Sequence, residues 1–112
     1  MLREGREHAQ QYQLDRMPYL HLILWATRPE FNLNRVYEIW LDRGLFDSWL
    51  VLTAYGRHGG GTTQKNHSFS TLEEAQVFID KVLNKRLKSQ NRIGCNYELI
   101  GKKYSNDFVY NA

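Results

Sequence analysis

The chain has 112 residues, enough for one compact domain but not comfortably for two. Its 42 % of hydrophobic and 13 % of aromatic residues can fill a core, and no apolar run approaches the roughly 20 residues that a membrane span needs. The net charge of +3 is mild, and a single cysteine excludes an intramolecular disulfide framework. The first residues lack the apolar stretch of a secretory signal, so we expect a cytoplasmic protein.

The first part of the chain is expected to form strands. Residues 1–17 are polar and are expected to be a tail or a weakly held helix. Apolar, β-branched and aromatic residues then predict strands over 19–26, 35–42, 48–55 and 62–69. The connection 42–47 has the length of a hairpin turn, and we expect Gly44 to supply its turn conformation. Four glycines within residues 56–61 predict a loop that permits positive φ angles and close approach by a partner.

The clearest predicted element is a helix that begins near residue 70. Ser70 with Glu73, and Thr71 with Glu74, offer two overlapping capping boxes. Apolar residues recur at three- and four-residue spacing and form one stripe, which consists of Leu72, Ala75, Phe78, Ile79, Val82 and Leu83. The opposite face carries Lys81, Lys85 and Lys88. The helix is expected to end near Ser89–Asn91.

A strand over 96–100 and a short segment at 108–110 are expected after the helix. The order of strands, helix and strand predicts an α+β domain over residues 18–104, with a mostly antiparallel sheet and one main helix packed on it. Residues 105–112 are expected to be a C-terminal tail. The three tryptophans are expected to belong to the core.

Several patterns that suggest an enzyme fail on inspection. Residues 56–61 have the glycine spacing of a phosphate-binding loop, but Thr62 stands where that loop needs a lysine. His58–Gly61 copies the oxyanion motif of lipases, yet no Gly-x-Ser-x-Gly nucleophile motif accompanies it. The histidines and Cys95 lack metal-ligand spacing. We therefore expect no catalytic residues, no metal site and no cofactor.

Positive charge is concentrated late in the chain. Between Lys81 and Lys103 there are seven basic residues and one acid, Glu98. Such a cluster can neutralise the phosphates of a nucleic acid, and it is equally compatible with a solvated helix face followed by a polar loop.

The stretch from Asn34 to Leu87 resembles the WGR domain through an ordered set of short motifs. These are NRVYEI at 34–39, LFDSWLVL at 45–52, YGRHG at 55–59, Gln64, FSTLEEA at 69–75 and the Lys85–Arg86 pair. With the strand that leads in from Leu20, the resemblance covers residues 18–103. Two positions depart from the family pattern, because Tyr55 replaces the Trp of the Trp-Gly-Arg motif and Asp47 replaces a glycine.

The resemblance implies a function in binding. The family occurs within poly(ADP-ribose) polymerases, where the domain grips a DNA end, and also as small bacterial proteins. It implies that this chain is the binding part alone and recognises DNA ends or backbone without sequence specificity. Tyr55 would stack on a terminal nucleotide, Arg57 would pair with phosphate, and Lys85 and Arg86 would hold the backbone. The full set of expected contact residues is Tyr55, Gly56, Arg57, His58, Lys65, Lys85, Arg86 and Lys88.

Other interpretations of the same residues remain open at this point. Tyr55 can equally be a core aromatic, and Arg57 can pair with Asp47 or Glu98. The alternative function is a protein–protein interaction module that docks a partner through the glycine-rich loop and an exposed sheet edge.

Overall fold

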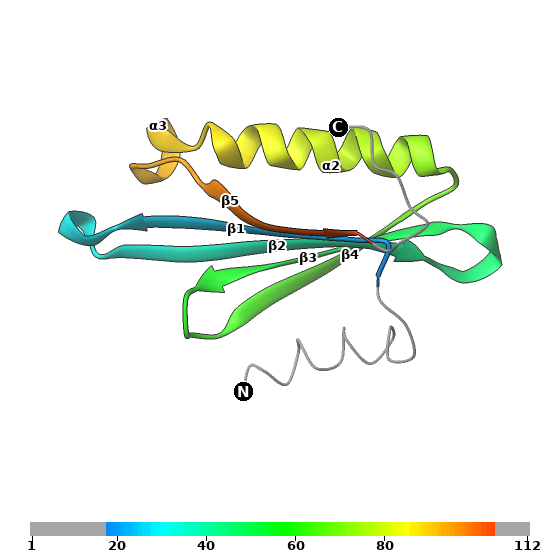
Figure 1. Cartoon of the computed structure of the whole chain (residues 1–112), viewed down its shortest axis with the longest axis horizontal. Coiled ribbons are helices and arrows are strands. Elements are labelled where there is room, and N and C mark those ends of the chain that lie inside the picture. The colour runs from blue at the N-terminus through cyan, green and yellow to red at the C-terminus, as the bar shows by residue number, and fades with distance from the viewer. Residues whose placement is uncertain (1–17, 105–112) are drawn as a thin grey trace.

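The computed structural model describes residues 18–104 as a five-stranded sheet with helices on one side (Figure 1). The strands are β1 (Leu20–Arg28), β2 (Leu33–Arg43), β3 (Trp49–Arg57), β4 (Thr62–Phe69) and β5 (Glu98–Tyr104). The helices are α2 (Leu72–Leu87) and the short α3 (Gln90–Ile93), and 3₁₀ turns η1 (Pro29–Phe31) and η2 (Leu45–Asp47) close the first two hairpins. The expected tails, 1–17 and 105–112, and the expected segment at 108–110 lie outside the described residues.

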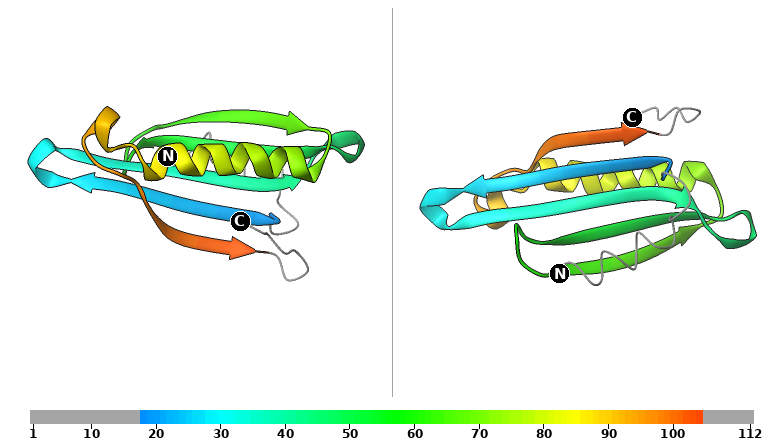
Figure 2. Two further views of the ribbon diagram at one scale, coloured as in Figure 1. Left: turned by 90° about the horizontal axis from the view of Figure 1, so that it is seen from above. Right: turned by 60° about the horizontal axis from the view of Figure 1, so that its bottom comes forward.

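The sheet has the strand order β4-β3-β2-β1-β5, and every neighbouring pair is antiparallel. Helix α2 runs lengthwise over one face, as the left view of Figure 2 shows, and the right view looks onto the opposite face. The predicted α+β class, with one main helix on a mostly antiparallel sheet, is confirmed. Within residues 18–104 no helix is long and apolar enough to cross a membrane.

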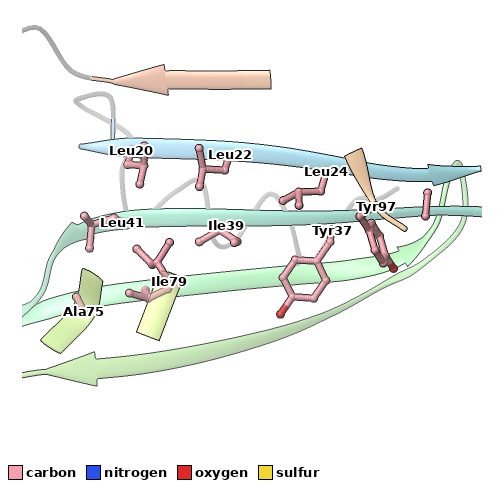
Figure 3. Packing of buried hydrophobic residues seen from close by; sticks show 11 residues of the cluster. Leu20, Leu22, Leu24, Tyr37, Ile39, Leu41, Ala75, Ile79 and Tyr97 are labelled. Carbon is pink, nitrogen blue, oxygen red and sulfur yellow. The ribbon is translucent and has the colours of Figure 1, made fainter. Parts of the chain in front are cut away.

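The core lies between α2 and the sheet (Figure 3). β1 and β2 contribute alternate side chains to this face because successive strand residues point to opposite sides. The fully buried members from these strands are Leu20, Leu22, Leu24, Ala26, Ile39 and Leu41. Ala75 and Ile79 of α2 are buried against them, and the rest of the predicted apolar stripe packs around this cluster. The stripe is therefore confirmed.

The start of α2 follows one of the two predicted capping boxes. Thr71 is the N-cap, and its hydroxyl accepts a hydrogen bond from the Glu74 amide at 3.1 Å. The Glu74 carboxylate in turn accepts from the Ser70 amide at 3.1 Å. The first bond satisfies an amide that the first helical turn leaves without a partner, and the second ties the residue before the N-cap to that turn. The Thr71–Glu74 prediction is confirmed, and the helix ends at Leu87, slightly earlier than expected.

The hairpin between β2 and β3 corrects a prediction. Gly44 has φ −101°, so it does not supply a left-handed turn; Phe46 (φ 55°) and Asp47 (φ 62°) do. Gly44 leaves room for the Ser48 side chain, because a Cβ at Gly44 would lie 2.4 Å from the Ser48 hydroxyl oxygen and that hydroxyl would have to rotate away. The left-handed φ of Asp47 also explains why the WGR pattern has glycine at that position.

The opposite face of the sheet holds a second, smaller cluster of Trp40, Leu52 and Ala54, with Leu50 beside it. His21 stacks on Trp40 at 4.7 Å between ring centroids, and its ring nitrogen lies 3.2 Å from the buried carboxylate of Glu38. Trp40 is thus a core residue, as expected, whereas Trp25 and Trp49 are half-buried.

Candidate nucleic-acid interface

Three segments that are distant in sequence meet at one end of the molecule, on the left in Figure 1. They are the β1–β2 turn, the β3–β4 loop and the C-terminal part of α2 with α3. The His58 amide donates to the Asn34 carbonyl at 2.8 Å, which joins the two hairpins. Arg28 donates to the Gly94 carbonyl at 2.8 Å, which joins the first hairpin to the segment after α3. We call this region the basic end, after its cations Arg28, Arg35, Arg57, Lys85, Arg86, Lys88 and Arg92.

A row of alternating contacts between cations and aromatic rings crosses the helix-facing side of the sheet at the basic end. It runs from Arg86 through Tyr37 and Tyr55 to Lys65, and we call it the ring ladder. The guanidinium of Arg86 lies 4.2 Å from the ring centroid of Tyr37. Tyr37 stacks on Tyr55 with centroids 5.4 Å apart and planes at 7°, and Lys65 lies 6.0 Å from the Tyr55 centroid. The ladder brings together three predicted site residues, Tyr55, Lys65 and Arg86. It also makes Tyr55 a half-buried residue that packs against the core.

Tyr97 completes the ladder beside Tyr37, with a 6.3 Å edge-on contact. Burial raises the pKa of the Tyr97 phenol, against the opposing effect of the nearby guanidinium groups of Arg86 and Arg35. The phenol therefore stays neutral at physiological pH. The cations at this end thus lie beside a group of uncharged tyrosine rings, Tyr37, Tyr55 and Tyr97.

Arg57 does not form either of the ion pairs considered from the sequence. Its guanidinium donates to the carbonyl and to the side-chain oxygen of Asn32, both at 3.0 Å. Asp47 lies at the other end of β3 and pairs with Arg43 at 3.2 Å, and Glu98 lies on β5, beyond β1. The hairpin register instead sets Arg57 beside the β1–β2 turn.

The glycine-rich loop is shaped mainly by its own hairpin. A Cβ on Gly56 would lie 2.2 Å from the Gly61 carbonyl oxygen, so the close approach that requires glycine is internal. Of the four glycines of the loop, only Gly59 has a positive φ, of 80°. The His58 ring stacks on Trp25 at 5.5 Å, and Trp25 donates to the side-chain oxygen of Asn34. His58 therefore contacts the opposite face of the sheet from Tyr55.

Comparison with known protein families matches residues 20–92 to the WGR domain. This chain belongs to the WGR domain family. The family provides nucleic-acid-binding modules of poly(ADP-ribose) polymerases and is a binding domain rather than a catalytic one. A comparison with curated proteins found no match.

In this WGR domain the family motif is Tyr55-Gly56-Arg57, at the end of β3. Each residue has a defined place: Tyr55 in the ring ladder, Gly56 at the narrow hairpin, and Arg57 on the β1–β2 turn. Lys85 and Lys88 are exposed at the end of α2, and the Lys85 carbonyl accepts from Arg92 at 2.9 Å. The motif and the end of the helix therefore flank one surface.

Most cations of this surface have no acidic partner within the described part of the chain, and Arg28, which pairs with Glu30, is the exception. The ion pairs seen between residues 18 and 104 are His21–Glu38, Arg28–Glu30 and Arg43–Asp47, and none involves Arg57, Lys65 or the lysines of α2. Over the same residues no group of His, Cys, Asp and Glu side chains is arranged to hold a metal ion.

Sequence reasoning missed three contributors to this surface: Tyr37, Arg35 and Asn32. Tyr37 and Arg35 stand directly opposite Tyr55 and Arg57 in the β2–β3 register. A hairpin centred on Phe46 pairs these positions. Knowing the centre of the turn would therefore have been enough to predict that Tyr37 and Arg35 lie beside the motif. Asn32 was hidden because its role depends on a left-handed backbone, with φ 53°, which the sequence pattern does not display.

Proposed function

We propose that this WGR domain binds DNA through the basic end and recognises strand ends or the sugar–phosphate backbone without sequence specificity. The observation that carries the proposal is the gathering of Arg57, Lys85 and Lys88 at one end, without acidic partners among the described residues. Uncompensated surface cations attract phosphates, and phosphate contacts carry no sequence information.

Each proposed contact follows from the chemistry of its side chain. The planar guanidinium of Arg57 is held in place by Asn32. The N–H groups of Arg57 that do not bond to Asn32 suit a phosphate. Lys85 and Lys88 are exposed point charges that follow the backbone further along. Tyr55 offers the part of its ring that Tyr37 leaves uncovered, and Lys65 adds a charge above it.

The other expected contact residues take lesser roles in this proposal. Arg86 supplies charge from behind the ladder, Gly56 lets the hairpin close, and His58 lines the far side of the loop. The chain would act as a binding module without catalysis. A cytoplasmic location is part of the proposal, since the free Cys95 suits a reducing compartment.

One observation favours a second candidate, a protein-interaction module. β4 is the last strand on its side of the sheet, so among the described strands its outer edge has no partner. Such an edge can add a strand from another protein, next to the glycine-rich loop. Binding of this kind depends on backbone hydrogen bonds and is less sensitive to salt than phosphate binding.

The test is a titration of the full chain with blunt, 5′-phosphorylated, nicked, single-stranded and closed circular DNA at low and high salt. We expect binding that weakens strongly with salt and is tighter for molecules with ends. No binding to any of these DNAs at low salt would overturn the proposal and leave the protein-interaction candidate.

A further inference from the structure

An exposed phenylalanine lies at the basic end, where sequence reasoning did not place an aromatic contact. Phe31 is the last residue of η1 in the β1–β2 turn and is 56 % exposed. The Arg28 guanidinium lies 4.4 Å from its ring centroid and therefore covers one face. A Cβ on Gly94 would lie 3.1 Å from one ring carbon, so the segment after α3 abuts one ring edge.

The ring of Phe31 is held firmly in this exposed position. Arg28, which lies over it, donates to the Gly94 carbonyl at 2.8 Å and pairs with Glu30 at 3.2 Å. The next residue, Asn32, accepts both hydrogen bonds of Arg57. Because η1 is fixed from both sides, the ring face opposite Arg28 is presented to solvent in a defined orientation.

The ring of Phe31 and the guanidinium that is proposed to bind phosphate are linked through one residue, Asn32. Phe31 adjoins Asn32, and Arg57 lies on Asn32 with two 3.0 Å bonds. A nucleotide needs this pair of groups, since its base stacks on an aromatic face and its phosphate accepts from a guanidinium. Tyr55 is the less open ring, because Tyr37 stacks on it and Lys65 lies over it.

Exposure alone does not distinguish Phe31, and the other end of the molecule shows why. Phe46, in the β2–β3 turn, is 97 % exposed. Its neighbour Asp47 carries a negative charge and pairs with Arg43. The two phenylalanines lie in turns at opposite ends of the sheet, and each is next to an acid that pairs with an arginine, Glu30 with Arg28 and Asp47 with Arg43. What distinguishes Phe31 is its neighbour Asn32, which holds Arg57, a guanidinium without an acidic partner among the described residues.

We infer that Phe31 stacks on an unpaired terminal nucleobase of a strand whose phosphate is held by Arg57. The inference rests on the proposed DNA-binding function and assigns the ligand class more narrowly. Inside a duplex each base is already stacked on both sides, so one protein ring finds a free base face only at an end or in an overhang. The ligand is thus a strand end with an unpaired base.

The experiment compares two DNAs by fluorescence anisotropy: a duplex with a short single-stranded overhang, and a closed circular duplex of the same sequence, which has neither ends nor unpaired bases. For Phe31→Ala and Phe31→Leu we expect affinity for the overhang duplex to fall about five- to 150-fold, the range of one base–aromatic stack, with little change on the closed duplex. Phe31→Trp should retain or improve overhang binding, because it restores a ring. Phe46→Ala is the matched control and should bind both DNAs like the wild type.

A second readout reports the stack directly. With 2-aminopurine as the terminal base, wild-type protein should quench its fluorescence and Phe31→Leu should not. If the wild type binds neither duplex at low salt, the proposed function fails and the inference with it. If the wild type binds but Phe31→Leu binds and quenches equally well, the inference alone is wrong. Equal loss on both duplexes would also overturn it, because Phe31 would then act by supporting the turn.

Discussion

The guanidinium of Arg86 lies over the ring of Tyr37, 4.2 Å from its centroid. Tyr37 stacks on Tyr55 in turn, so this contact fastens the end of α2 to β2 and β3. The Nε of Arg86 is buried and finds no hydrogen-bond partner among residues 18–104, which leaves the ring as the main contact of this part of the guanidinium. One side chain thus serves the fold and adds a cation to the proposed interface.

Replacing Arg86 by lysine separates these two contributions. Arg86→Lys keeps the charge but loses the flat group that stacks on Tyr37. We expect the free energy of unfolding, from urea denaturation, to fall by about 0.5–1 kcal/mol, while the salt dependence of DNA binding stays the same. Lys88→Gln, at an exposed position nearby, should leave the unfolding free energy unchanged. An unaltered stability of Arg86→Lys would show that the stack contributes nothing.

The packing of α2 is tested at Phe78. Its ring lies 5.3 Å from that of Phe69 and 4.4 Å from that of His67. Because Phe78 is half-buried, Phe78→Ala should cost about 2–3 kcal/mol, below the value for a fully buried ring. Val77→Ala, one position along and 55 % exposed, is the control and should change stability little. Equal melting of both variants would mean that the helix does not pack as described.

The helix and the strands could be predicted because local patterns determine them. The stripe from Leu72 to Leu83 and the Thr71–Glu74 cap act within a few residues, and each is present as expected. The β2–β3 turn could not be predicted in the same way. Gly44 was the obvious turn former, yet its φ is negative, and the left-handed positions fall on Phe46 and Asp47.

The strained turn leads to a prediction about Phe46. This residue has φ 55° and is 97 % exposed. Its left-handed backbone conformation therefore destabilises the folded state, and burial of the ring does not offset this. Asparagine tolerates left-handed backbone better than other residues with a side chain. Phe46→Asn should therefore raise the unfolding free energy by about 0.5–1 kcal/mol. A loss of stability in urea would contradict an exposed, unpacked ring.

The pH dependence of stability should include a contribution from His67. Desolvation beside Phe78, and secondarily the charge of Lys65, lower the pKa of His67 below its ordinary value of 6.5. The unfolded chain then binds the proton more readily, so this contribution is complete above pH 6.5 and is lost as the pH falls toward the lowered pKa. His67→Gln should show a smaller loss of stability on acidification than the wild type. Identical losses would mean that His67 is not desolvated, and His58→Gln is the control.

The candidate site was harder to predict than the fold because it depends on contacts between distant residues. The chain positions of Tyr55, Arg57 and Lys85 were visible in the sequence, but their neighbours were not. Arg57 was expected to pair with phosphate, with Asp47 or Glu98 as alternative partners, and within the described residues it meets Asn32, since the hairpin ends bring the two together. Phe31 escaped notice because its exposure follows from η1 and Gly94, which no local pattern displays.

The salt dependence of DNA affinity tests the central claim, that the basic end holds phosphates. For a short duplex we expect a log–log slope of roughly −0.9 for each phosphate contacted, about −3 for three contacts. Lys85→Gln and Arg57→Gln should each make the slope shallower by about one unit. Lys103→Gln, on β5 at the opposite end, should leave it unchanged. A wild-type slope near zero, or equal effects of Lys85→Gln and Lys103→Gln, would contradict the account.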